Sequence, residues 1–345
     1  MYDISLITGD GIGPELSESA ISILETIHDK LDVKTKIISL EAGDIALEKY
    51  GHALPDETFE SIKSSDVCLK APVGESAADV IVVLRRKLDL FANIRPAKSY
   101  PSTPALRDDV DLVIVRENTE DLYTGHEFEL EGSAVALRII TEKASKRIAK
   151  HAFQVAIQRD QKKCVTCVHK SNVMRKTDGL FAKSCKSVAD EFPDVRFDQM
   201  YVDACSMNLI RQPQEFDVIV TTNLFGDILS DQSSQVVGGL GMAPAANLGD
   251  DFGLFEPVHG AAFDIAGKQI ANPTSFILSI KMMLEWLGRR NGIGELVSIA
   301  GLIDDSVSEH LKDGKALTYD LGGDASCSFV GESIANRLAT KLSEL

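Results

Sequence analysis

Long apolar runs are missing from this chain of 345 residues. A helix that crosses a bilayer needs about 20 consecutive apolar residues, and no stretch approaches that length. The start also lacks the basic n-region and the cleavage pattern of a signal peptide. Basic residues are outnumbered, because 36 Lys and Arg face 52 Asp and Glu, which gives a net charge of −16. These absences argue against a membrane protein and against nucleic acid as a general partner, and they predict a cytoplasmic location.

A matched set of metal-binding cysteines is absent as well. Of the six cysteines, only Cys164 and Cys167 have the spacing of a zinc or redox motif. A zinc site would need two further ligands arranged nearby, and the sequence offers none. Because the pair falls in the apolar stretch 163–169, we interpret both cysteines as small hydrophobic side chains of a buried strand.

What the chain does have is an alternation of strand-like and helix-like stretches, with 44% hydrophobic residues. Strands are predicted at 3–8, 34–40, 66–71, 111–116, 163–169 and 216–223; helices are predicted from Pro14 to about Leu31, at 77–88, 142–159 and 178–191, from Pro273 to about Leu287, and from about Glu332. This alternation predicts an α/β protein with a parallel or mixed sheet. The less helical segment 127–138 is a candidate β-arm for dimer formation.

The most informative segment is Phe-Gly-Asp-Ile-Leu-Ser-Asp at 225–231. In a helix, Asp227 and Asp231 would share a face, where two like charges repel. A divalent cation such as Mg²⁺ or Mn²⁺ would turn that repulsion into coordination. A solvated acidic face is the ordinary alternative. The predicted strand 216–223 leads straight into the pair, however, and open α/β sheets bind ligands beyond the carboxyl ends of their strands.

A glycine-rich segment, Gly-Asp-Gly-Ile-Gly-Pro-Glu, stands at 9–15. It does not match the dinucleotide-binding fingerprint, because the third glycine comes one residue early and Pro14 follows it. Taken alone, a tight turn between a strand and a helix explains these glycines about as well.

Several basic and aromatic residues are candidates for substrate binding and proton transfer. If Arg85, Arg95 and Arg116 converge, their planar guanidinium groups would bind the carboxylates of an acidic substrate. Taken singly, each is more often part of a surface salt bridge. Tyr123 and Lys170 are candidate proton-transfer groups. The alternatives for these two residues are a hydrogen-bonded structural tyrosine and an exposed lysine.

The order of these motifs resembles that of the β-decarboxylating dehydrogenases, which include isopropylmalate, isocitrate, homoisocitrate and tartrate dehydrogenases. The matching stretches cover essentially the whole chain; they are 9–15, 84–85, 93–96, 115–123, 168–173, 201–203, 225–231, 256–260 and 271–273. The resemblance implies an α/β fold of the isocitrate/isopropylmalate dehydrogenase type, with mixed sheets flanked by helices and the active site in a cleft between two domains. Residues 1–99 with 238–345 would form the larger, cofactor-binding domain. Residues 100–237 would form the smaller domain, with the dimer interface and the arm.

The resemblance also implies roles for the charged residues. Arg85, Arg95 and Arg116 would bind the malate carboxylates of the substrate. Asp227 and Asp231 would be ligands of Mg²⁺ or Mn²⁺.

The active sites would be shared between the subunits of a homodimer. Asp203 of the partner subunit would complete the metal site, and Lys170 of the partner subunit would assist removal of the hydroxyl proton. Tyr123 would protonate the enolate carbon after CO₂ leaves.

The cofactor implied by the resemblance is NAD. Its contacts would be Asn172, Glu256, His259, Gly260, Asp264, Ile265 and Asn272. Asp264 and Ile265 stand where NADP-using isocitrate relatives carry a lysine and a tyrosine. Because a carboxylate accepts hydrogen bonds from a ribose diol and repels a 2′-phosphate, Asp264 favours NAD.

The substrate implied by the resemblance is 3-isopropylmalate, oxidatively decarboxylated to 4-methyl-2-oxopentanoate in leucine biosynthesis. Ile81 and Val82 offer an aliphatic surface where isocitrate dehydrogenases bind a third carboxylate. One departure is Ala78, which replaces a glutamate of isopropylmalate enzymes; Glu75 is a possible substitute. Homoisocitrate and isocitrate dehydrogenase stay open as alternatives, and a regulatory subunit of the same fold is the non-catalytic one.

Overall fold

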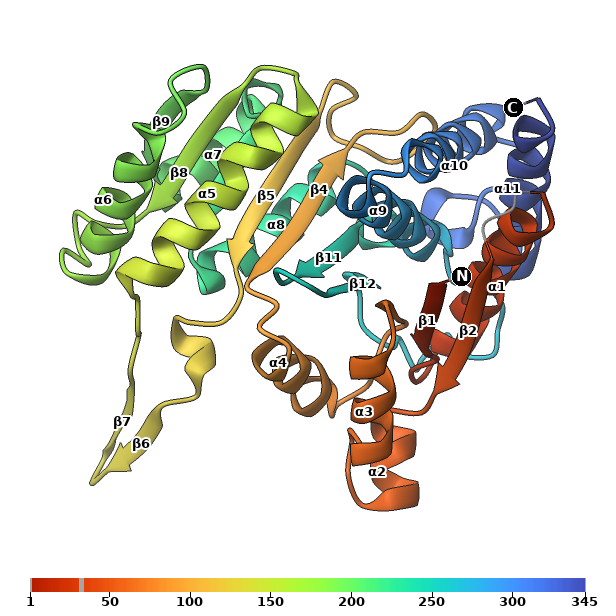
Figure 1. The fold of residues 1–345 in the computed structure, drawn as a ribbon, viewed down its shortest axis with the longest axis horizontal. Helices are drawn as coiled ribbons and strands as arrows, with labels where there is room; N and C mark the ends of the chain where they lie inside the picture. Colours follow the sequence, from red (N-terminus) through yellow and green to blue (C-terminus); the bar gives the residue numbers. More distant parts are fainter. Residues whose placement is uncertain (1, 31–33, 345) are drawn as a thin grey trace.

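The computed structural model describes residues 2–30 and 34–344, so the predicted helix end at Leu31 lies outside the described residues (Figure 1). The strands are β1 (Tyr2–Ile7), β2 (Thr35–Leu40), β3 (Val67–Lys70), β4 (Ala92–Lys98), β5 (Asp111–Glu117), β6 (Glu127–Leu130), β7 (Ser133–Ala136), β8 (Cys164–His169), β9 (Arg196–Tyr201), β10 (Val218–Thr221), β11 (Pro244–Leu248) and β12 (Gly253–Pro257). The α-helices are α1 (Gly13–Lys30), α2 (Asp44–Tyr50), α3 (Asp56–Ser64), α4 (Ala77–Lys87), α5 (Glu142–Arg159), α6 (Thr177–Ala189), α7 (Val202–Arg211), α8 (Asn223–Val236), α9 (Thr274–Asn291), α10 (Gly294–Asp313) and α11 (Cys327–Leu342).

A mixed ten-stranded sheet runs through the described residues in the order β2-β1-β3-β12-β11-β4-β5-β10-β8-β9. The outer strands pair in parallel on both sides of the molecule. In the middle, β11 and β4 run antiparallel to their neighbours. The predicted α/β class and mixed sheet are therefore confirmed.

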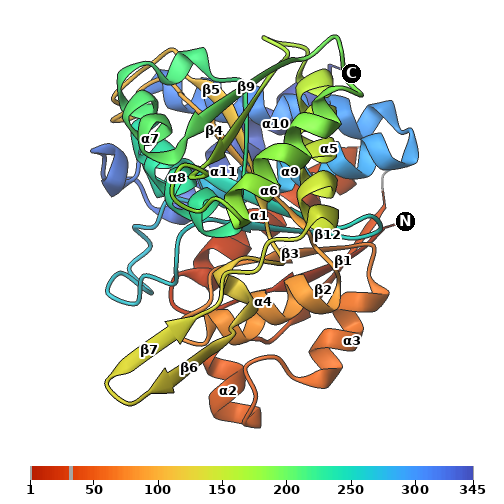
Figure 2. The ribbon, with the colours of Figure 1, turned by 90° about the vertical axis from the view of Figure 1, so that its left-hand side faces the viewer.

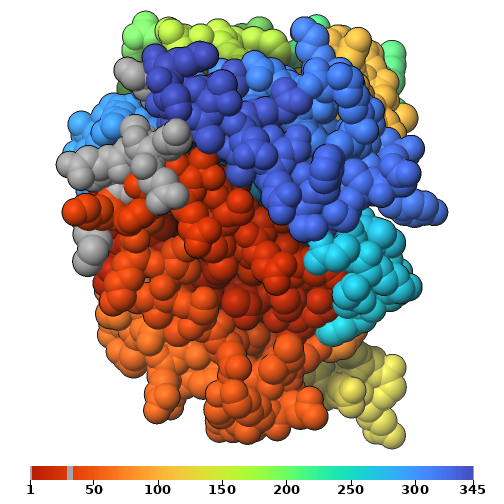
Figure 3. Space-filling model, turned by 90° about the vertical axis from the view of Figure 1, so that its right-hand side faces the viewer, coloured from red at the N-terminus to blue at the C-terminus, as the bar shows by residue number. Residues whose placement is uncertain are grey.

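Helices cover both faces of the sheet, because its strands are apolar on both sides. On β5, Val113 and Val115 join the core cluster that includes α5, whereas Leu112 and Ile114 join the cluster that includes α7 and α8. α9 packs on β11 and β12. α11 packs on α1, so the two ends of the chain lie together on one face (Figure 3).

The hairpin of β6 and β7 projects away from the body of the molecule (Figure 2). Its strands correspond to the predicted β-arm. The side chains of Phe128 and Leu130 are 48% and 58% exposed, which suits a surface that another subunit covers. Use of the arm in a dimer stays a prediction.

Most predicted elements match the structure, but several boundaries differ. Helix α9, predicted to end at about Leu287, continues to Asn291. The strand predicted to reach residue 223 ends at Thr221, because Asn223 already begins α8. The last helix begins at Cys327 and not near Glu332, since the side chain of Ser326 caps it by accepting from the N–H of Phe329 at 3.2 Å.

The interpretations of the cysteine pair and of the glycine-rich turn also hold. Cys164 and Cys167 are buried free thiols on β8. Gly9 and Gly11 have φ angles of 69° and 57° in the turn between β1 and α1, a conformation that favours glycine.

The predicted division into two domains falls at loops on both sides, after β4 and after α8. The sheet nevertheless continues across it, because β4 of the larger part pairs with β5 of the smaller part. Within the described residues, no helix combines the length and the apolar character that a bilayer crossing requires.

Candidate active site

The candidate site lies on one face of the sheet at β4 and β5. Because side chains alternate along a strand, Asn93 and Arg95 of β4 point to this face, whereas Ile94 and Pro96 point to the other. Arg116 of β5 lies directly opposite Asn93 and shares its face. Alternation therefore gathers the polar residues of neighbouring strands at one place.

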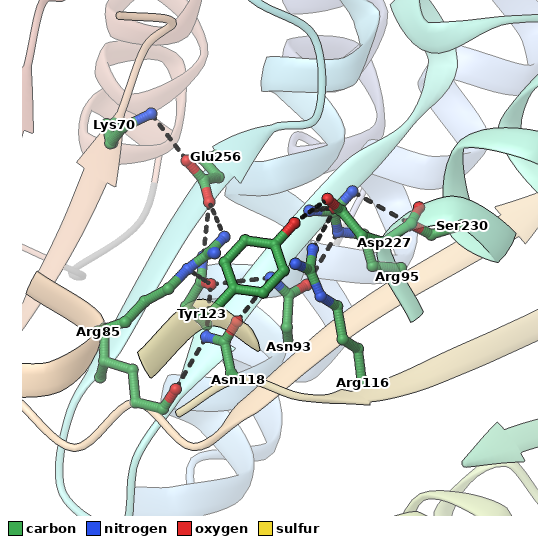
Figure 4. Close-up of polar contacts among 12 residues, drawn as sticks. Lys70, Arg85, Asn93, Arg95, Arg116, Asn118, Tyr123, Asp227, Ser230 and Glu256 are labelled. Carbon is green, nitrogen blue, oxygen red and sulfur yellow. Dashed lines mark hydrogen bonds and ion pairs between the residues drawn. The ribbon is translucent and has the colours of Figure 1, made fainter. Parts of the chain in front are cut away.

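Arg85, Arg95 and Arg116 converge here from α4, β4 and β5 (Figure 4). They are only 6%, 8% and 1% exposed. Arg116 forms an ion pair with Asp227, and Arg95 Nη2 lies 3.8 Å from the same carboxylate oxygen. On the other side of the cluster, Arg85 Nε donates to Asn247 Oδ1 at 2.9 Å. Their role as binders of substrate carboxylates stays a prediction.

Burial and mutual repulsion destabilise the positive charges of this cluster. The pKa of Arg85 is lowered to about 10, first by burial and then by the charges of Arg116 and Arg95, against the opposing charge of Glu256. The pKa of Arg95 is lowered by burial and by Arg116, against the opposing charge of Asp227. An anionic ligand with several carboxylates would supply the missing counter-charge.

A chain of polar side chains holds Arg85 in place. Lys70 Nζ lies 2.7 Å from Glu256 Oε2, and Asn247 Nδ2 donates to Glu256 Oε1 at 2.8 Å. Burial alone would raise the pKa of Glu256, but Lys70 and Arg85 outweigh it and lower the pKa to about 2. Glu256 is thus an anion inside the cluster, and its predicted contact with the cofactor stays a prediction.

Sequence reasoning assigned no role to several members of this network, namely Lys70, Asn93, Asn118, Asn223 and Asn247. Asn93 Nδ2 and Asn118 Nδ2 both donate to Asn247 Oδ1, at 2.9 and 3.0 Å. Asn223 Oδ1 accepts from Arg116 Nε at 3.0 Å. The sequence offered one signal for two of these residues, because Lys70 ends an apolar strand and Asn223 lies two residues after the end of another.

Helix α8 places Asp227 and Asp231 one turn apart on the side that faces the arginines, as the spacing predicts. Tyr123 OH donates to Asp227 Oδ2 at 2.5 Å, and Arg95 Nη1 lies 3.4 Å from Asp231 Oδ1. Burial alone would raise the pKa of Asp227, but Arg116 and the Tyr123 hydroxyl lower it. The pKa of Asp231 is raised, first by burial, and the charge of Asp227 adds to it.

This carboxylate pair fits a divalent cation. Asp227 and Asp231 offer only oxygen atoms, the donors that Mg²⁺ and Mn²⁺ prefer. Their side chains are 37% and 55% exposed, so a cation can reach them. In the described part of the chain, no group of three or more His, Cys, Asp and Glu residues is arranged to hold a metal ion. The remaining ligands would therefore come from substrate, water or another subunit.

Lys170 and Asp203 form an ion pair with each other at a separate place. Lys170 follows β8, and Asp203 lies in the first turn of α7. The structure does not bring this pair to the arginine cluster of its own chain. Their side chains are 26% and 60% exposed, which leaves them accessible to a partner subunit.

Two of the predicted cofactor residues are held by hydrogen bonds. His259 Nε2 lies 3.1 Å from Ser275 Oγ, and burial lowers the pKa of the histidine. Asn272 Nδ2 donates to Asp320 Oδ2 at 3.0 Å. Both residues belong to the connection between β12 and α9.

The same connection carries three further predicted contacts. Gly260 and Asp264 are exposed, and Ile265 is half-buried beside the main core. Asn172 is also exposed but lies apart, in the loop after β8. Asp264 and Ile265, the residues that favour NAD, therefore lie in the same connection as His259. Asn172 lies elsewhere, two residues after Lys170 in the sequence.

Helix α4 presents the predicted substrate-selecting residues beside Arg85. Ile81 and Val82 lie four and three positions before it and so share its side of the helix. Ile81 also packs against the core cluster that contains Val80 and Leu84, and both Ile81 and Val82 are half-buried. An aliphatic surface thus adjoins the arginine cluster.

A groove of about 700 Å³ lies on the opposite face of the sheet, between α5 and α9. Ile94 and Pro96 of β4 form part of its floor, and Arg147 and Trp286 lie on its walls. Since it contains none of the three arginines or the two aspartates, this groove is separate from the candidate site.

Comparison with known proteins decides the family. Residues 3–334 match the family described as isocitrate/isopropylmalate dehydrogenase. The chain belongs to this family. A 3-isopropylmalate dehydrogenase of Saccharolobus solfataricus is 51% identical to it, with 94% of this chain and 96% of that protein covered. A 3-isopropylmalate dehydrogenase of Sulfurisphaera tokodaii is 50% identical, with 98% of this chain and 99% of that protein covered.

A solved structure of the family supports the fold. The crystal structure of an isocitrate dehydrogenase from Methylococcus capsulatus has a TM-score of 0.90 and 42% sequence identity, and covers 98% of this chain and 100% of that one. The resemblance and the fold type inferred from the motifs are therefore confirmed.

Proposed function

We propose that this protein oxidatively decarboxylates 3-isopropylmalate to 4-methyl-2-oxopentanoate in leucine biosynthesis, with NAD⁺ as the hydride acceptor. Two relatives at about half identity carry 3-isopropylmalate dehydrogenase as their name. The observation that carries the proposal is a cluster of three buried arginines around Asp227, adjoined by the aliphatic residues of α4.

The arginines bind and orient the substrate. A malate unit carries two carboxylates, and the planar forks of Arg85, Arg95 and Arg116 match carboxylate geometry. Their fixed positions on α4, β4 and β5 hold the hydroxyl-bearing carbon in one orientation. Binding of the substrate also relieves the repulsion among the buried guanidinium groups.

Asp227 and Asp231 would hold Mg²⁺ or Mn²⁺, with Asp203 of the partner subunit as a further ligand. A bound cation would supply Lewis-acid stabilisation of the negative charge that develops on the substrate oxygen. The ion pairs of Asp227 with Arg116 and Arg95 keep these charges balanced before ligands arrive.

Proton transfers fall to two residues. Lys170 of the partner subunit assists removal of the hydroxyl proton while the hydride leaves the same carbon. The bond to the carboxyl group then breaks, CO₂ departs, and Tyr123 protonates the enolate carbon. Burial raises the pKa of Tyr123, and its hydrogen bond to Asp227 raises it further, so the hydroxyl keeps the proton it must donate.

The shared site implies a homodimer in which the arm and helices α7 and α8 meet a second copy. Exposed apolar side chains support this assembly: Met207 and Ile210 on α7 and Ile228 on α8 are between 57% and 59% exposed.

We place the cofactor in the larger domain, 1–99 with 238–345, and the active site in a cleft between it and the smaller domain, 100–237. We place the protein in the cytoplasm.

Homoisocitrate and isocitrate are the alternative substrates, because Ala78 removes the glutamate that isopropylmalate enzymes carry on this helix. Glu75, three residues earlier, is exposed. A regulatory subunit without catalysis would not need Tyr123, Lys170 and the aspartates, and their presence favours an enzyme.

For the unmodified protein, kcat/KM for isopropylmalate is expected to exceed that for isocitrate by at least about a hundredfold, or ~2.7 kcal/mol. A third carboxylate next to Ile81 and Val82 loses hydration without gaining a donor, whereas an isopropyl group gains about 25 cal/mol per Å² of buried apolar surface. NADH formation is measured in parallel with isopropylmalate, isocitrate, homoisocitrate, malate and tartrate.

Ile81→Ser and Val82→Asn are expected to narrow this preference. Val83→Ser is the matched control, because Val83 lies on the side of α4 away from Arg85 and is equally half-buried. A preference of the unmodified protein for isocitrate or homoisocitrate would reject the substrate assignment.

The cofactor preference is expected to be at least about tenfold for NAD⁺ over NADP⁺ in kcat/KM, or ~1.4 kcal/mol. The carboxylate of Asp264 repels a 2′-phosphate and accepts hydrogen bonds from a ribose diol. Asp264→Lys combined with Ile265→Tyr should shift the preference towards NADP⁺. Asp305→Lys, the same charge change at an exposed position of α10, should leave it unchanged. Equal use of both cofactors by the unmodified protein would contradict the assignment.

A further inference from the structure

The segment 9–15, which comprises the turn between β1 and α1 and the first turn of α1, carries two buried carboxylates that the proposed chemistry does not use. Asp10 is 1% exposed and Glu15 is 7% exposed. Burial of a carboxylate costs free energy unless hydrogen bonds or charges compensate. The partners of each carboxylate therefore show which parts of the molecule the turn holds.

Asp10 holds the loop that leads into α4. Its Oδ2 accepts from the backbone N–H groups of Asp44 at 2.8 Å and of Gly74 at 2.9 Å, and its Oδ1 accepts from Ile45 at 3.1 Å. The backbone N–H of Asp10 donates to Pro72 O at 2.8 Å. One buried carboxylate thus joins the turn, the start of α2 and the loop 71–76.

Asp44 continues this connection to the start of α4. Its Oδ2 accepts from Glu75 N at 3.0 Å, and its Oδ1 accepts from Ser76 N at 2.8 Å and Ser76 Oγ at 2.6 Å. Ser76 is the cap residue of α4 but makes no side-chain cap hydrogen bond to it. The fit is close, because a Cβ on Gly74 would lie 2.0 Å from Asp44 Oδ2. The position of α4, and with it Arg85, therefore depends on Asp44.

Glu15 holds a different segment, 258–270, which contains Asp264 and Ile265, the residues that favour NAD. Its Oε1 accepts from the backbone N–H of Gly267 at 2.5 Å. Ile12 N donates to Ala261 O at 2.9 Å, and a Cβ on Gly11 would lie 2.1 Å from that oxygen. Figure 3 shows the segment in cyan beside the red N-terminal and blue C-terminal surfaces.

The segment 258–270 needs such support because its backbone is strained. Ala262 and Gln269 have φ angles of 41° and 58°, in the left-handed region that side chains disfavour. Such conformations persist only where surrounding contacts fix them. In the described part of the chain, Glu15 Oε2 has no hydrogen-bond partner. The Glu15 carboxylate therefore contacts the segment through the hydrogen bond that Oε1 accepts from the backbone N–H of Gly267.

We propose that the segment 9–15, together with Asp44 of α2, positions the two binding regions separately: Asp10 and Asp44 position the substrate-selecting helix α4, and Glu15 positions the cofactor segment 258–270. The inference rests on the proposed function, which assigns α4 to the substrate and the segment to NAD. It adds three positioning residues, which act through hydrogen bonds to the backbone of the loop before α4 and of the segment 258–270.

The substrate side is tested with Asp44→Ala and Asp44→Asn. Asp44→Ala removes all three hydrogen bonds to residues 75 and 76, so KM for isopropylmalate should rise about tenfold and the preference over isocitrate should narrow. Asp44→Asn keeps one acceptor oxygen and should show a smaller effect. The dissociation constant of NADH, measured by its own fluorescence on protein without substrate, should change less than about twofold in both variants.

The cofactor side is tested with Glu15→Ala and Glu15→Gln. Loss of the acceptor in Glu15→Ala should raise the dissociation constant of NADH about fivefold to tenfold and narrow the preference for NAD⁺ over NADP⁺. KM for isopropylmalate should change less than about twofold. Glu15→Gln keeps an acceptor oxygen for Gly267 and should restore NADH binding.

Glu41→Gln is the matched control, because Glu41 pairs with Lys49 and Tyr50 at the surface and binds neither region through its side chain. Thermal unfolding of every variant identifies any general loss of stability, and Asp44→Asn serves if Asp44→Ala does not fold. The inference is overturned if Asp44→Ala and Glu15→Ala each raise KM for isopropylmalate and the dissociation constant of NADH to the same extent. It is also overturned if the two variants change neither KM nor the dissociation constant. Failure of the unmodified protein to oxidise isopropylmalate would reject the proposed function, while the NADH comparison would still decide the role of Glu15.

Discussion

Excess chelator is expected to abolish turnover, and added Mn²⁺ or Mg²⁺ is expected to restore it. Asp227→Asn should lower kcat/KM by at least about a hundredfold, or ~2.7 kcal/mol. The amide replaces one of the oxygen donors and removes the negative charge that a divalent cation needs. NADH formation from isopropylmalate, titrated with metal in the wild type and in the variant, measures both effects.

A second variant separates metal binding from the other contacts of Asp227. Asp227→Asn also removes a charge partner from the buried Arg116, which can lower stability, so its thermal unfolding is recorded as well. Asp231→Asn should impair metal use with less effect on stability, because Asp231 is more exposed and, among the described residues, forms an ion pair with Arg95 alone. Asp190→Asn, at an exposed carboxylate directly after α6 that pairs with Lys186, is the control for the substitution itself. Full activity in excess chelator would contradict the metal assignment.

The elements that bear the site could be predicted because their signals are local. Asp227 and Asp231 stand four residues apart after an apolar strand. This pattern alone predicts a carboxylate pair on a helix, beyond the carboxyl end of that strand. The continuous apolar run 112–115 likewise predicts a buried strand that ends in Arg116, and the structure extends β5 by one residue to Glu117. Helical spacing predicts α5 with the same bounds that the structure shows.

The polar network behind the arginines could not be predicted, because its partners are far apart in the sequence. Lys70 and Glu256 are separated by 186 positions, and Arg85 and Asn247 by 162. Only the order of strands in the sheet, in which β3, β12, β11 and β4 are neighbours, brings these side chains together. Nothing in the local pattern of Asn247 distinguishes it from an ordinary polar residue within an apolar strand.

The roles of Asp10, Asp44 and Glu15 were missed for a related reason. The glycine-rich segment at 9–15 is compatible with a tight turn from its sequence, and its conformation is that of a turn. The hydrogen bonds of this segment could not be predicted, because their partners, the backbone N–H groups of residues 44, 74 and 267, are far away in the sequence.

Subunit mixing is expected to restore activity to two inactive variants. Lys170→Ala and Tyr123→Phe should each lose at least about a hundredfold in kcat/KM, since each removes a group to which we assign a proton transfer. If Lys170 acts in the site of the partner subunit, a hybrid dimer contains one site with both residues intact and one site with neither. After random exchange of equal amounts, half of the dimers are hybrids, so about a quarter of the wild-type activity should return. The activity of the mixture is followed over time by NADH formation.

The structure gives this experiment its physical basis and its control. Lys170 pairs with Asp203 in an exposed position, whereas Tyr123 binds Asp227 beside the arginines. Two residues on the same side of a shared site cannot complement each other, because every hybrid site lacks one of them. Mixing Tyr123→Phe with Asp227→Asn should therefore restore nothing, although the subunits exchange equally well. If exchange is demonstrated with differently tagged subunits and Lys170→Ala with Tyr123→Phe also restores nothing, each chain must carry a complete site, and Lys170 must act within its own subunit.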